Sequence, residues 1–432
     1  MAHLALAGGT PVRTTPFTPW PQFGDEERRA LTEVLDGRNW GGFPFPNTHA
    51  RRFAEAFAAH HGSRHALAVT NGTIALEVAL KACGLRPGDE VIVPAYTFEA
   101  TAVPILRLGG VPVFVDVKPD TYCLDVDAAA AAVTPRTRTL LPVHLASGMA
   151  DMDAVAALAG RHGLRVIEDC AHAHGAEWRG RGAGSLGDAG AFSMQTGKLM
   201  TAGEGGAVTT NDDEIFEICQ SYANCGRVSA TDRFRRRLVG FNYRLTDFQA
   251  AVLSAQLSRL DAQNAQRRAR AARLTAGLAT IRGLTPLACD SRVTRQAIYQ
   301  FVIKYDARAF GGASRDRFVA ALELEGIPCD GLFYEPIYRS PLFRVAPGEY
   351  PAVPLGTDGA PPWASTRCPV AERAAYDEAV WLGHSLLLGP DSDVDDIVEA
   401  AAKIQRNSTE LVRAEHPLIA VKATNRAERD RR

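Results

Sequence analysis

A regular alternation of short apolar strands and amphipathic helices runs through the first part of the chain. Strands are expected at 65–69, 90–94, 111–117, 139–143 and 164–167, and helices at 24–36, 48–60, 74–83, 100–108, 126–132 and 152–161. Strand–helix–strand crossovers build a largely parallel sheet covered by helices, with ligands collecting at the carboxyl ends of the strands. The alternation therefore predicts an α/β fold with a mainly parallel central sheet.

The pattern changes in the second part of the chain. A long helix is expected from 247 to about 278, and short strands, helices and a Pro/Gly-rich loop follow over 297–390. Because 432 residues exceed what one core usually serves, we expect two domains. We predict an N-terminal arm over 1–20, a large domain over 21–265, a smaller C-terminal α/β domain over 266–404, and a disordered polar tail over 405–432.

Charge and cysteine content exclude several classes of protein. The formal net charge is -1, so the chain lacks the basic field that drives nucleic-acid binding. The eight cysteines contain no C-x-x-C pair, which predicts neither a metal site nor a disulfide framework. The chain also has no basic leader and no apolar run of about 18 residues, so we expect a cytoplasmic protein without a membrane partner.

A turn between the first strand and the helix after it is suited to an anion. The sequence Thr70-Asn71-Gly72-Thr73 lies between the strand 65–69 and the helix from 74. The first amides of a helix have no partner within the helix, and the helix dipole favours negative charge there. This turn is a candidate phosphate site.

Two charged residues occur at positions where chemistry is expected. Asp169 follows a buried strand and precedes small residues and His172, so it could pair with a cationic ring nitrogen; capping a helix is the equally supported alternative. Lys198 lies in an uncharged stretch between a strand-like segment and glycines. A poorly solvated lysine loses its proton easily and can form a Schiff base, although most loop lysines are simply solvated.

Several ordered motifs together resemble the DegT/StrS family of sugar and cyclitol aminotransferases, over residues 4–404. They are TNGTIALEVAL (70–80), VIVPAYTFEAT (91–101), EDCAHAHGAEW (168–178), GDAGAFSMQTGKLMTAGEGG (187–206) and GFNYRLTDFQAAVLSAQL (240–257). The resemblance implies the type I aminotransferase fold, with a large domain that binds pyridoxal 5'-phosphate and a smaller C-terminal domain.

The resemblance also implies roles for individual residues. Lys198 would form the Schiff base with pyridoxal phosphate and move the substrate proton, and Asp169 would keep the pyridine nitrogen protonated. His172 would contact the O3' side of the cofactor ring. Phe98 would stack on the ring face; a core aromatic is the alternative for this residue.

The phosphate group has its own set of expected ligands. Gly72 and Thr73 would provide amides and a hydroxyl, and Ser193 a second hydroxyl. Asn242, in the Asn-Tyr-Arg-Leu segment, would reach the phosphate from the partner subunit, so the resemblance implies a homodimer with shared active sites.

The sequence around the lysine bears on the substrate. The run Thr196-Gly197-Lys198-Leu199-Met200 is closer to the branch of scyllo-inosose aminotransferases and 3-amino-5-hydroxybenzoate synthase, and a second departure, which also bears on the substrate, is Met194 where Phe is common. We therefore expect transfer of an amino group from glutamate or glutamine to a keto-cyclitol or ketosugar, in secondary-metabolite or amino-sugar biosynthesis.

Other substrates and functions stay open at this point. Arg235, Arg236 and Arg237 lie in a basic segment that hangs over the neighbouring subunit's pocket in this family; they could hold the pyrophosphate of a nucleotide sugar or a carboxylate, or be a solvated basic loop. A nucleotide-diphosphate ketosugar aminotransferase, an aromatising lyase like 3-amino-5-hydroxybenzoate synthase, and a non-catalytic regulator that binds pyridoxal phosphate are the alternatives.

Overall fold

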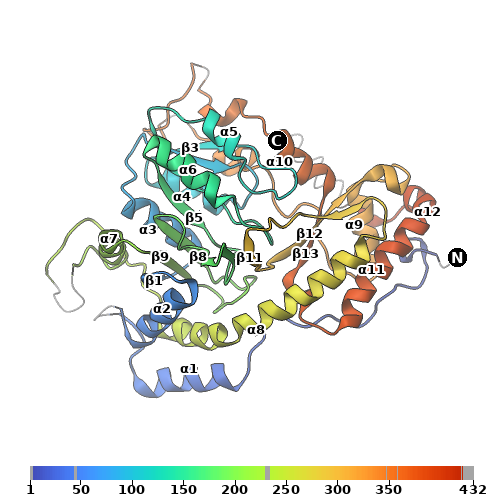
Figure 1. Ribbon diagram of the computed structural model, residues 1–432, viewed down its shortest axis with the longest axis horizontal. Coiled ribbons are helices and arrows are strands. Elements are labelled where there is room, and N and C mark those ends of the chain that lie inside the picture. The colour runs from blue at the N-terminus through green and yellow to red at the C-terminus, as the bar shows by residue number, and fades with distance from the viewer. Residues whose placement is uncertain are drawn as a thin grey trace.

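The computed structural model, which describes residues 3–42, 46–228, 234–346, 348–357, 359–419 and 421, has a seven-stranded sheet at its centre (Figure 1). The strand order is β1-β9-β8-β5-β4-β2-β3, and β9 alone among these runs antiparallel to its neighbours. The strands are β1 (His65–Val69), β2 (Glu90–Pro94), β3 (Val111–Val115), β4 (Thr137–Leu140), β5 (Arg165–Asp169), β8 (Ala189–Ser193) and β9 (Gly206–Thr210). The predicted mainly parallel sheet is confirmed.

Helices cover this sheet. The helix α3 lies on β8 and β9, α2 packs beside β1, and α6 packs on β4 and β5. The helices of this part are α1 (Asp25–Gly37), α2 (Thr48–His61), α3 (Gly72–Ala82), α4 (Val103–Arg107), α5 (Val126–Ala131), α6 (Met152–His162) and α7 (Asp213–Ala223). The crossovers leave the ends of β5 and β8 and the start of α3 in one region, where the predicted site lies.

The long helix α8 (Asp247–Leu278) runs along one side of the molecule and joins its two parts (Figure 1). Its first half packs against α1 and α2, and its second half packs against α11 (Asp391–Arg406). Beside α11 lies a second sheet of β10 (Leu284–Pro286), β12 (Gln300–Tyr305) and β13 (Ala379–Gly383), with α9 (Arg315–Leu324). The remaining short β-strands and α-helices are β6 (Glu177–Trp178), β7 (Arg181–Gly182), β11 (Val293–Arg295), α10 (Pro369–Arg373) and α12 (Ser408–Arg413).

Buried apolar side chains form two clusters. One surrounds the seven-stranded sheet and includes Leu253 and Leu260 of α8; the other surrounds the second sheet and includes Leu274 and Leu278 of the same helix. Part of the C-terminal half, up to Trp381, packs with the first cluster. The division into 21–265 and 266–404 stays a proposal, which the two clusters support.

Two local elements depart most from their expected bounds. The helix expected over 100–108 is a 3-10 turn, Glu99–Thr101, followed by α4 from Val103, because Pro104 has no amide hydrogen and fits only the first turn of a helix. The strand expected over 139–143 ends at Leu140, and Val143 makes an isolated bridge to Asp169.

The stretch after residue 405 differs from the expected disorder over its first part. The helix α12 covers Ser408–Arg413, and its Leu411 is fully buried in the second cluster. The carboxylate of Glu410 accepts a hydrogen bond from the amide of Leu4 (2.9 Å) and contacts His3. Leu411 and Glu410 attach this polar helix to the second cluster and to the N-terminal arm, and Arg317 of α9 donates to the carbonyls of Leu411 (3.2 Å) and Ala414 (2.7 Å). Residues 420 and 422–432 lie outside the described residues.

Every helix in the described part of the chain is too short or too polar to cross a lipid bilayer.

Candidate active site

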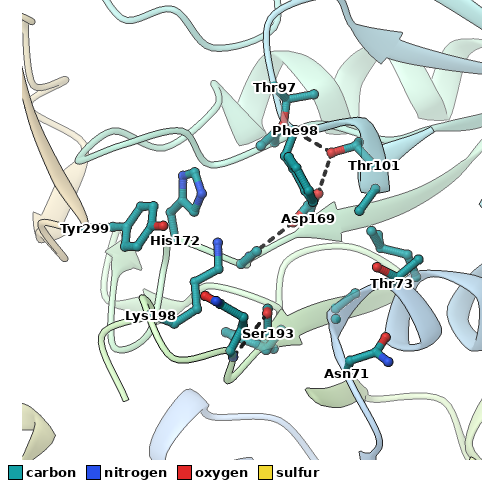
Figure 2. Close-up of a pocket in the computed structure, with 18 of the residues that line it drawn as sticks. Asn71, Thr73, Thr97, Phe98, Thr101, Asp169, His172, Ser193, Lys198 and Tyr299 are labelled. Atoms are coloured by element: carbon teal, nitrogen blue, oxygen red, sulfur yellow. Dashed lines mark hydrogen bonds between the residues drawn. The ribbon is translucent and has the colours of Figure 1, made fainter. Parts of the chain in front are cut away.

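A cavity of about 680 Å³ opens at the carboxyl ends of β5 and β8, beside the first turn of α3 (Figure 2). Most of the residues predicted to hold the cofactor line it. These are Gly72, Thr73, Phe98, Asp169, His172, Ser193 and Lys198. Residues from four separate sequence motifs therefore meet around one volume, which is large enough for a cofactor and a small substrate.

Asp169 is the last residue of β5 and is buried at the base of the cavity. Its Oδ2 accepts a hydrogen bond from the hydroxyl of Thr101 (2.8 Å), and its Oδ1 accepts one from the amide of Ala171 (3.1 Å). Burial raises the pKa of Asp169 above its usual range, while the two donors and Lys198 oppose that shift. Since both oxygens accept hydrogen bonds, the carboxylate is held in a fixed orientation in which it can pair with a cation.

Lys198 lies on the turn after β8, and its side chain rises into the cavity (Figure 2). Its Nζ lies 4.4 Å from the centre of the Tyr299 ring and makes no hydrogen bond to any described residue. Burial lowers the pKa of this amine to about 8, although Asp169 pulls in the opposite direction. A sizeable fraction of the amine is therefore uncharged and nucleophilic near neutral pH.

The first turn of α3 and the end of β8 approach each other closely. A Cβ on Gly72 would lie 2.6 Å from the Cβ of Ser193, so only glycine fits there. Asn71 caps the helix, with its Oδ1 accepting from the amide of Ile74 (2.9 Å). The first amides of α3 and the hydroxyls of Thr73 and Ser193 consequently lie around one part of the cavity, an arrangement suited to an anion.

His172 has a defined tautomer. The amide of Ala146 donates to its Nδ1 (3.1 Å), so the ring hydrogen is on Nε2, which donates to the hydroxyl of Tyr334 (3.1 Å). Burial holds the pKa of His172 well below its usual range, and the ring stays neutral. It stacks on Tyr299 with 4.1 Å between ring centres, so three aromatic rings form one wall of the cavity.

Phe98 lies at the mouth of the cavity, in front of Asp169 (Figure 2). Its side chain is 54% exposed, whereas its neighbours Tyr96 and Thr97 are buried. The alternative that Phe98 is a core aromatic is wrong for this chain. An exposed ring at a cavity mouth is available to stack on a planar ligand.

The residues predicted to act across a subunit boundary do not line the cavity of their own chain. Asn242 is exposed and pairs with Asn224 through a backbone bridge. Arg235, Arg236 and Arg237 lie on the exposed segment that projects beyond α7 (Figure 1), and Arg237 forms ion pairs with acids of α7. Residues 229–233 of this basic segment lie outside the described residues.

Three residues at the site were not predicted from the sequence. Thr101 holds Asp169, and Tyr299 and Tyr334 complete the wall around His172 and Lys198. Thr101 ends the motif VIVPAYTFEAT (91–101), four residues after Thr97, so its position in that motif could have indicated a role at the site. The two tyrosines belong to the C-terminal half, which offered no comparable motif.

A buried group behind Asp169 contains residue types that bind metals. Potential ligand atoms of His144, Glu168 and Cys170 lie within 4.8 Å of one another. The Glu168 carboxylate already accepts hydrogen bonds from His144 (2.9 Å) and from the amides of Gly184, Leu186 and Gly187. Burial raises the pKa of Cys170 well above its usual range, which keeps it a thiol. We therefore infer that these three residues have a structural role, in which their hydrogen bonds hold β5 in place.

The fold and the cavity define an enzyme of the aminotransferase class, and the comparisons with known proteins give the family. The model of the DegT/DnrJ/EryC1/StrS aminotransferase family matches residues 21–401. A protein of Streptoalloteichus tenebrarius with the provisional name L-glutamine:3-amino-2,3-dideoxy-scyllo-inosose aminotransferase is 46% identical over 411 residues, covering 94% of this chain and 98% of the relative. The L-glutamine:2-deoxy-scyllo-inosose aminotransferase of the same organism is 41% identical, covering 95% and 99%.

A solved structure agrees with these relatives. The crystal structure of 3-amino-5-hydroxybenzoic acid synthase superposes with a TM-score of 0.82 at 40% identity, covering 91% of this chain and 100% of the other. The chain therefore belongs to the DegT/DnrJ/EryC1/StrS aminotransferase family, and its predicted fold class is confirmed.

Proposed function

We propose that this aminotransferase uses pyridoxal 5'-phosphate to move an amino group from glutamine or glutamate to the keto group of a cyclitol. The observation that carries the proposal is the meeting of Lys198 and Asp169 in one cavity that also contains the first turn of α3. A nucleophilic amine, a buried carboxylate and an anion-binding position are the three groups that a phosphorylated pyridine aldehyde needs.

The residues present fit that cofactor. Gly72, Thr73 and Ser193 would hold the phosphate, since the missing side chain at Gly72 lets the first helical amides approach it. Asp169 would accept a hydrogen bond from the ring nitrogen, and Phe98 would cover one face of the ring. Lys198, without a hydrogen-bonding partner among the described residues, would hold the aldehyde carbon.

The chain's own residues then handle protons and orientation. When bound, pyridoxal phosphate supplies a conjugated ring that accepts the electrons left when a substrate proton is removed. Lys198 removes and returns that proton, because its amine has a pKa of about 8 and is uncharged in part at neutral pH. Asp169 keeps the ring nitrogen protonated. His172 is neutral, so it adds no positive charge to the cavity.

The acceptor proposed here rests on the relatives and on the cavity wall. Relatives 41 to 46% identical over nearly the whole chain are named as glutamine-dependent aminotransferases of inososes. The rings of Phe98, Tyr299 and Tyr334 can pack on the C–H face of a six-membered ring. These observations favour a free keto-cyclitol over a nucleotide-linked sugar.

Glutamine with a keto-cyclitol is expected to sustain turnover in the purified enzyme. In the first half-reaction, glutamine or glutamate alone should convert the cofactor absorbance to that of the aminated form, and an added inosose should reverse it. The measurement is a substrate panel followed by absorbance, with nucleotide ketosugars and a carboxylated aminoketocyclohexene included. Conversion of the acid to an aromatic product without glutamine, by enzyme whose cofactor stays in the aldehyde form, would instead favour an activity like that of the 3-amino-5-hydroxybenzoate synthase.

Inhibition by a nucleotide distinguishes the nucleotide-linked alternative. We expect a nucleoside diphosphate at millimolar concentration to leave the half-reaction nearly unchanged, since no described arginine lines the cavity of its own chain. Strong inhibition that weakens when Arg235, Arg236 and Arg237 are replaced by alanine would instead favour a nucleotide sugar. The single variant Arg51→Ala, a surface arginine on α2, is a matched control.

We further propose that two chains form a dimer in which each provides Asn242 to the other's phosphate site. Asn242 is exposed on its own chain and lies near exposed apolar side chains, Phe234 (90%), Val239 (84%) and Phe241 (44%). Apolar residues gathered on one exposed segment are typical of a surface that a partner covers. The family resemblance supplies the cross-subunit role.

Mixing two inactive variants is expected to restore activity. In a heterodimer of Lys198→Ala and Asn242→Ala chains, one site has both defects and the other has neither, so the purified heterodimer should regain about half of the wild-type activity. Refolding or exchange of differently tagged chains, followed by purification of the heterodimer, provides the sample. Heterodimers that form but stay inactive would place Asn242 outside the partner's site.

A further inference from the structure

The turn that carries Lys198, residues 195–198, makes its own hydrogen bonds over a short range of the chain: the amide and the hydroxyl of Thr196 both donate to the carbonyl of Gly203 (2.9 and 3.1 Å). The amide of Lys198 donates to the carbonyl of Gln195 (2.8 Å), and the amide of Gly197 donates to the side chain of Gln195 (2.8 Å). Gln195 and Thr196 are exposed, and Gly197 gives the backbone extra freedom. These local bonds leave the carbonyl oxygens of Thr196 and Gly197 to be held from elsewhere.

Two aromatic side chains from distant parts of the chain hold those carbonyl oxygens. The indole Nε1 of Trp20, in the N-terminal arm, donates to the carbonyl of Thr196 (2.8 Å). The Nε2 of His384, which directly follows β13, donates to the carbonyl of Gly197 (3.1 Å). The lysine turn is thus hydrogen-bonded on consecutive residues to the arm and to the second sheet.

The two aromatic rings also support each other. Their centres lie 4.6 Å apart in an edge-to-face arrangement. The guanidinium of Arg267, fully buried on α8, lies 5.4 Å from the centre of the Trp20 ring, within range of a cation–π interaction. Trp20 therefore packs against both a buried cation and an imidazole, which limits its movement.

His384 is a donor of fixed orientation. A carbonyl oxygen only accepts, so the ring hydrogen is on Nε2. Burial holds the pKa of His384 well below its usual range, and the positive charges of Arg267 and Lys198 act in the same direction, so the ring is neutral. Its other face stacks towards Tyr299, 6.0 Å between ring centres, and Tyr299 in turn lies against the Lys198 amine.

We propose that Trp20 and His384 are positioning residues that hold the lysine turn by two consecutive carbonyl oxygens and so aim the Lys198 amine at the reacting carbon. Neither residue lines the cavity, so both act through the turn rather than on the substrate. This proposal rests on the proposed function of Lys198. A displacement of about 1 Å at a reacting group can cost on the order of 100-fold in rate, which makes the turn's position measurable.

The decisive comparison is among three replacements of His384. A glutamine can put an amide hydrogen where Nε2 lies, an asparagine puts one nearer Nδ1, and a leucine has none. We expect His384→Leu and His384→Asn to lower the rate constant of the glutamine half-reaction at saturation by roughly 10-fold to 100-fold, and His384→Gln to retain most of it. The apparent affinity for glutamine should change little, because the binding surface is intact.

Trp20→Phe tests the other half of the contact. It keeps a ring between Arg267 and His384 but has no donor for Thr196, so we expect a similar loss in rate with an unchanged affinity. The pH midpoint of the absorbance change of the lysine-linked cofactor should shift in Trp20→Phe and His384→Leu but not in His384→Gln. His162→Leu, an exposed histidine at the end of α6, is the control for loss of an imidazole.

Each result bears on the proposal in a defined way. Melting temperature and borohydride fixation of the cofactor show which variants are folded and loaded; should His384→Leu fail to fold, the glutamine–asparagine comparison and Trp20→Phe carry the test. The proposal is overturned if the His384 and Trp20 variants carry the cofactor and still have the wild-type rate constant for the half-reaction and the wild-type pH midpoint. A wild-type protein in which borohydride fixes no cofactor on Lys198 would instead contradict the proposed function itself.

Discussion

Replacing Lys198 with alanine is expected to abolish turnover and to remove the covalent, borohydride-reducible link to the cofactor. Lys198 is the lysine that lines the cavity among the described residues, and its amine faces the volume in front of Asp169. The loss removes both the attachment point and the group that moves the substrate proton. A positioned acid–base group alone contributes up to about 10⁴-fold, so we expect at least that loss.

The pH dependence of cofactor attachment is a second test of the role of Lys198. Burial lowers the pKa of Lys198 from 10.5 to about 8, so the reactive neutral amine becomes the major form as the pH rises above about 8. The rate at which the cofactor-free protein acquires pyridoxal phosphate should rise with pH and level off above that value. An ordinary exposed lysine would keep rising by tenfold per pH unit to about pH 10.

Controls separate loss of chemistry from loss of fold. Lys81→Ala, at the exposed end of α3, should keep wild-type rates, absorbance and melting temperature. Lys198→Ala should still retain pyridoxal phosphate weakly through the phosphate-binding turn. Multiple turnovers by the Lys198→Ala protein, with the variant's mass verified, would show that another group carries the reaction.

Periodicity in the sequence predicted the strands around the site better than it predicted the contacts between side chains that complete the site. The strands β1 and β2 and the helix α8 have the bounds that periodicity gave, because a buried strand is a short apolar run and α8 keeps a helical pattern over its whole length. The position of Asp169 at a strand end and of Gly72 at a helix start also follow from local sequence. These are positions that the backbone alone determines.

The contacts that complete the site depend on residues far apart in the chain. The hydroxyl of Thr101 meets Asp169 across 68 positions, and His384 meets Gly197 across 187. Nothing in the periodicity of the C-terminal half indicates that Tyr299 will lie against Lys198. Such contacts follow from how the second sheet packs beside the first, which a single sequence does not encode in any local window.

Asp169→Asn is expected to bind the cofactor but to lose most of the rate, by a factor on the order of 10³, or about 4 kcal/mol of transition-state stabilisation. The substitution is nearly isosteric: the asparagine oxygen can accept from the amide of Ala171, and its NH2 group can donate to Thr101, whose hydroxyl can turn towards Thr97 at 3.1 Å. The fold should therefore persist, while the negative charge that keeps the ring nitrogen protonated is lost.

Single-turnover kinetics with glutamine measure the Asp169 effect, and Thr101→Val provides the matched comparison. Thr101→Val removes one donor to Oδ2 but leaves the carboxylate, so we expect a loss of roughly 10-fold, far smaller than that of Asp169→Asn. Because the charge and not the hydrogen bond carries the larger share, the order wild type, Thr101→Val, Asp169→Asn should hold at every pH between 6 and about 9. Asp169→Asn with near wild-type rates, or with a smaller loss than Thr101→Val, would mean that a group other than Asp169 keeps the ring nitrogen protonated.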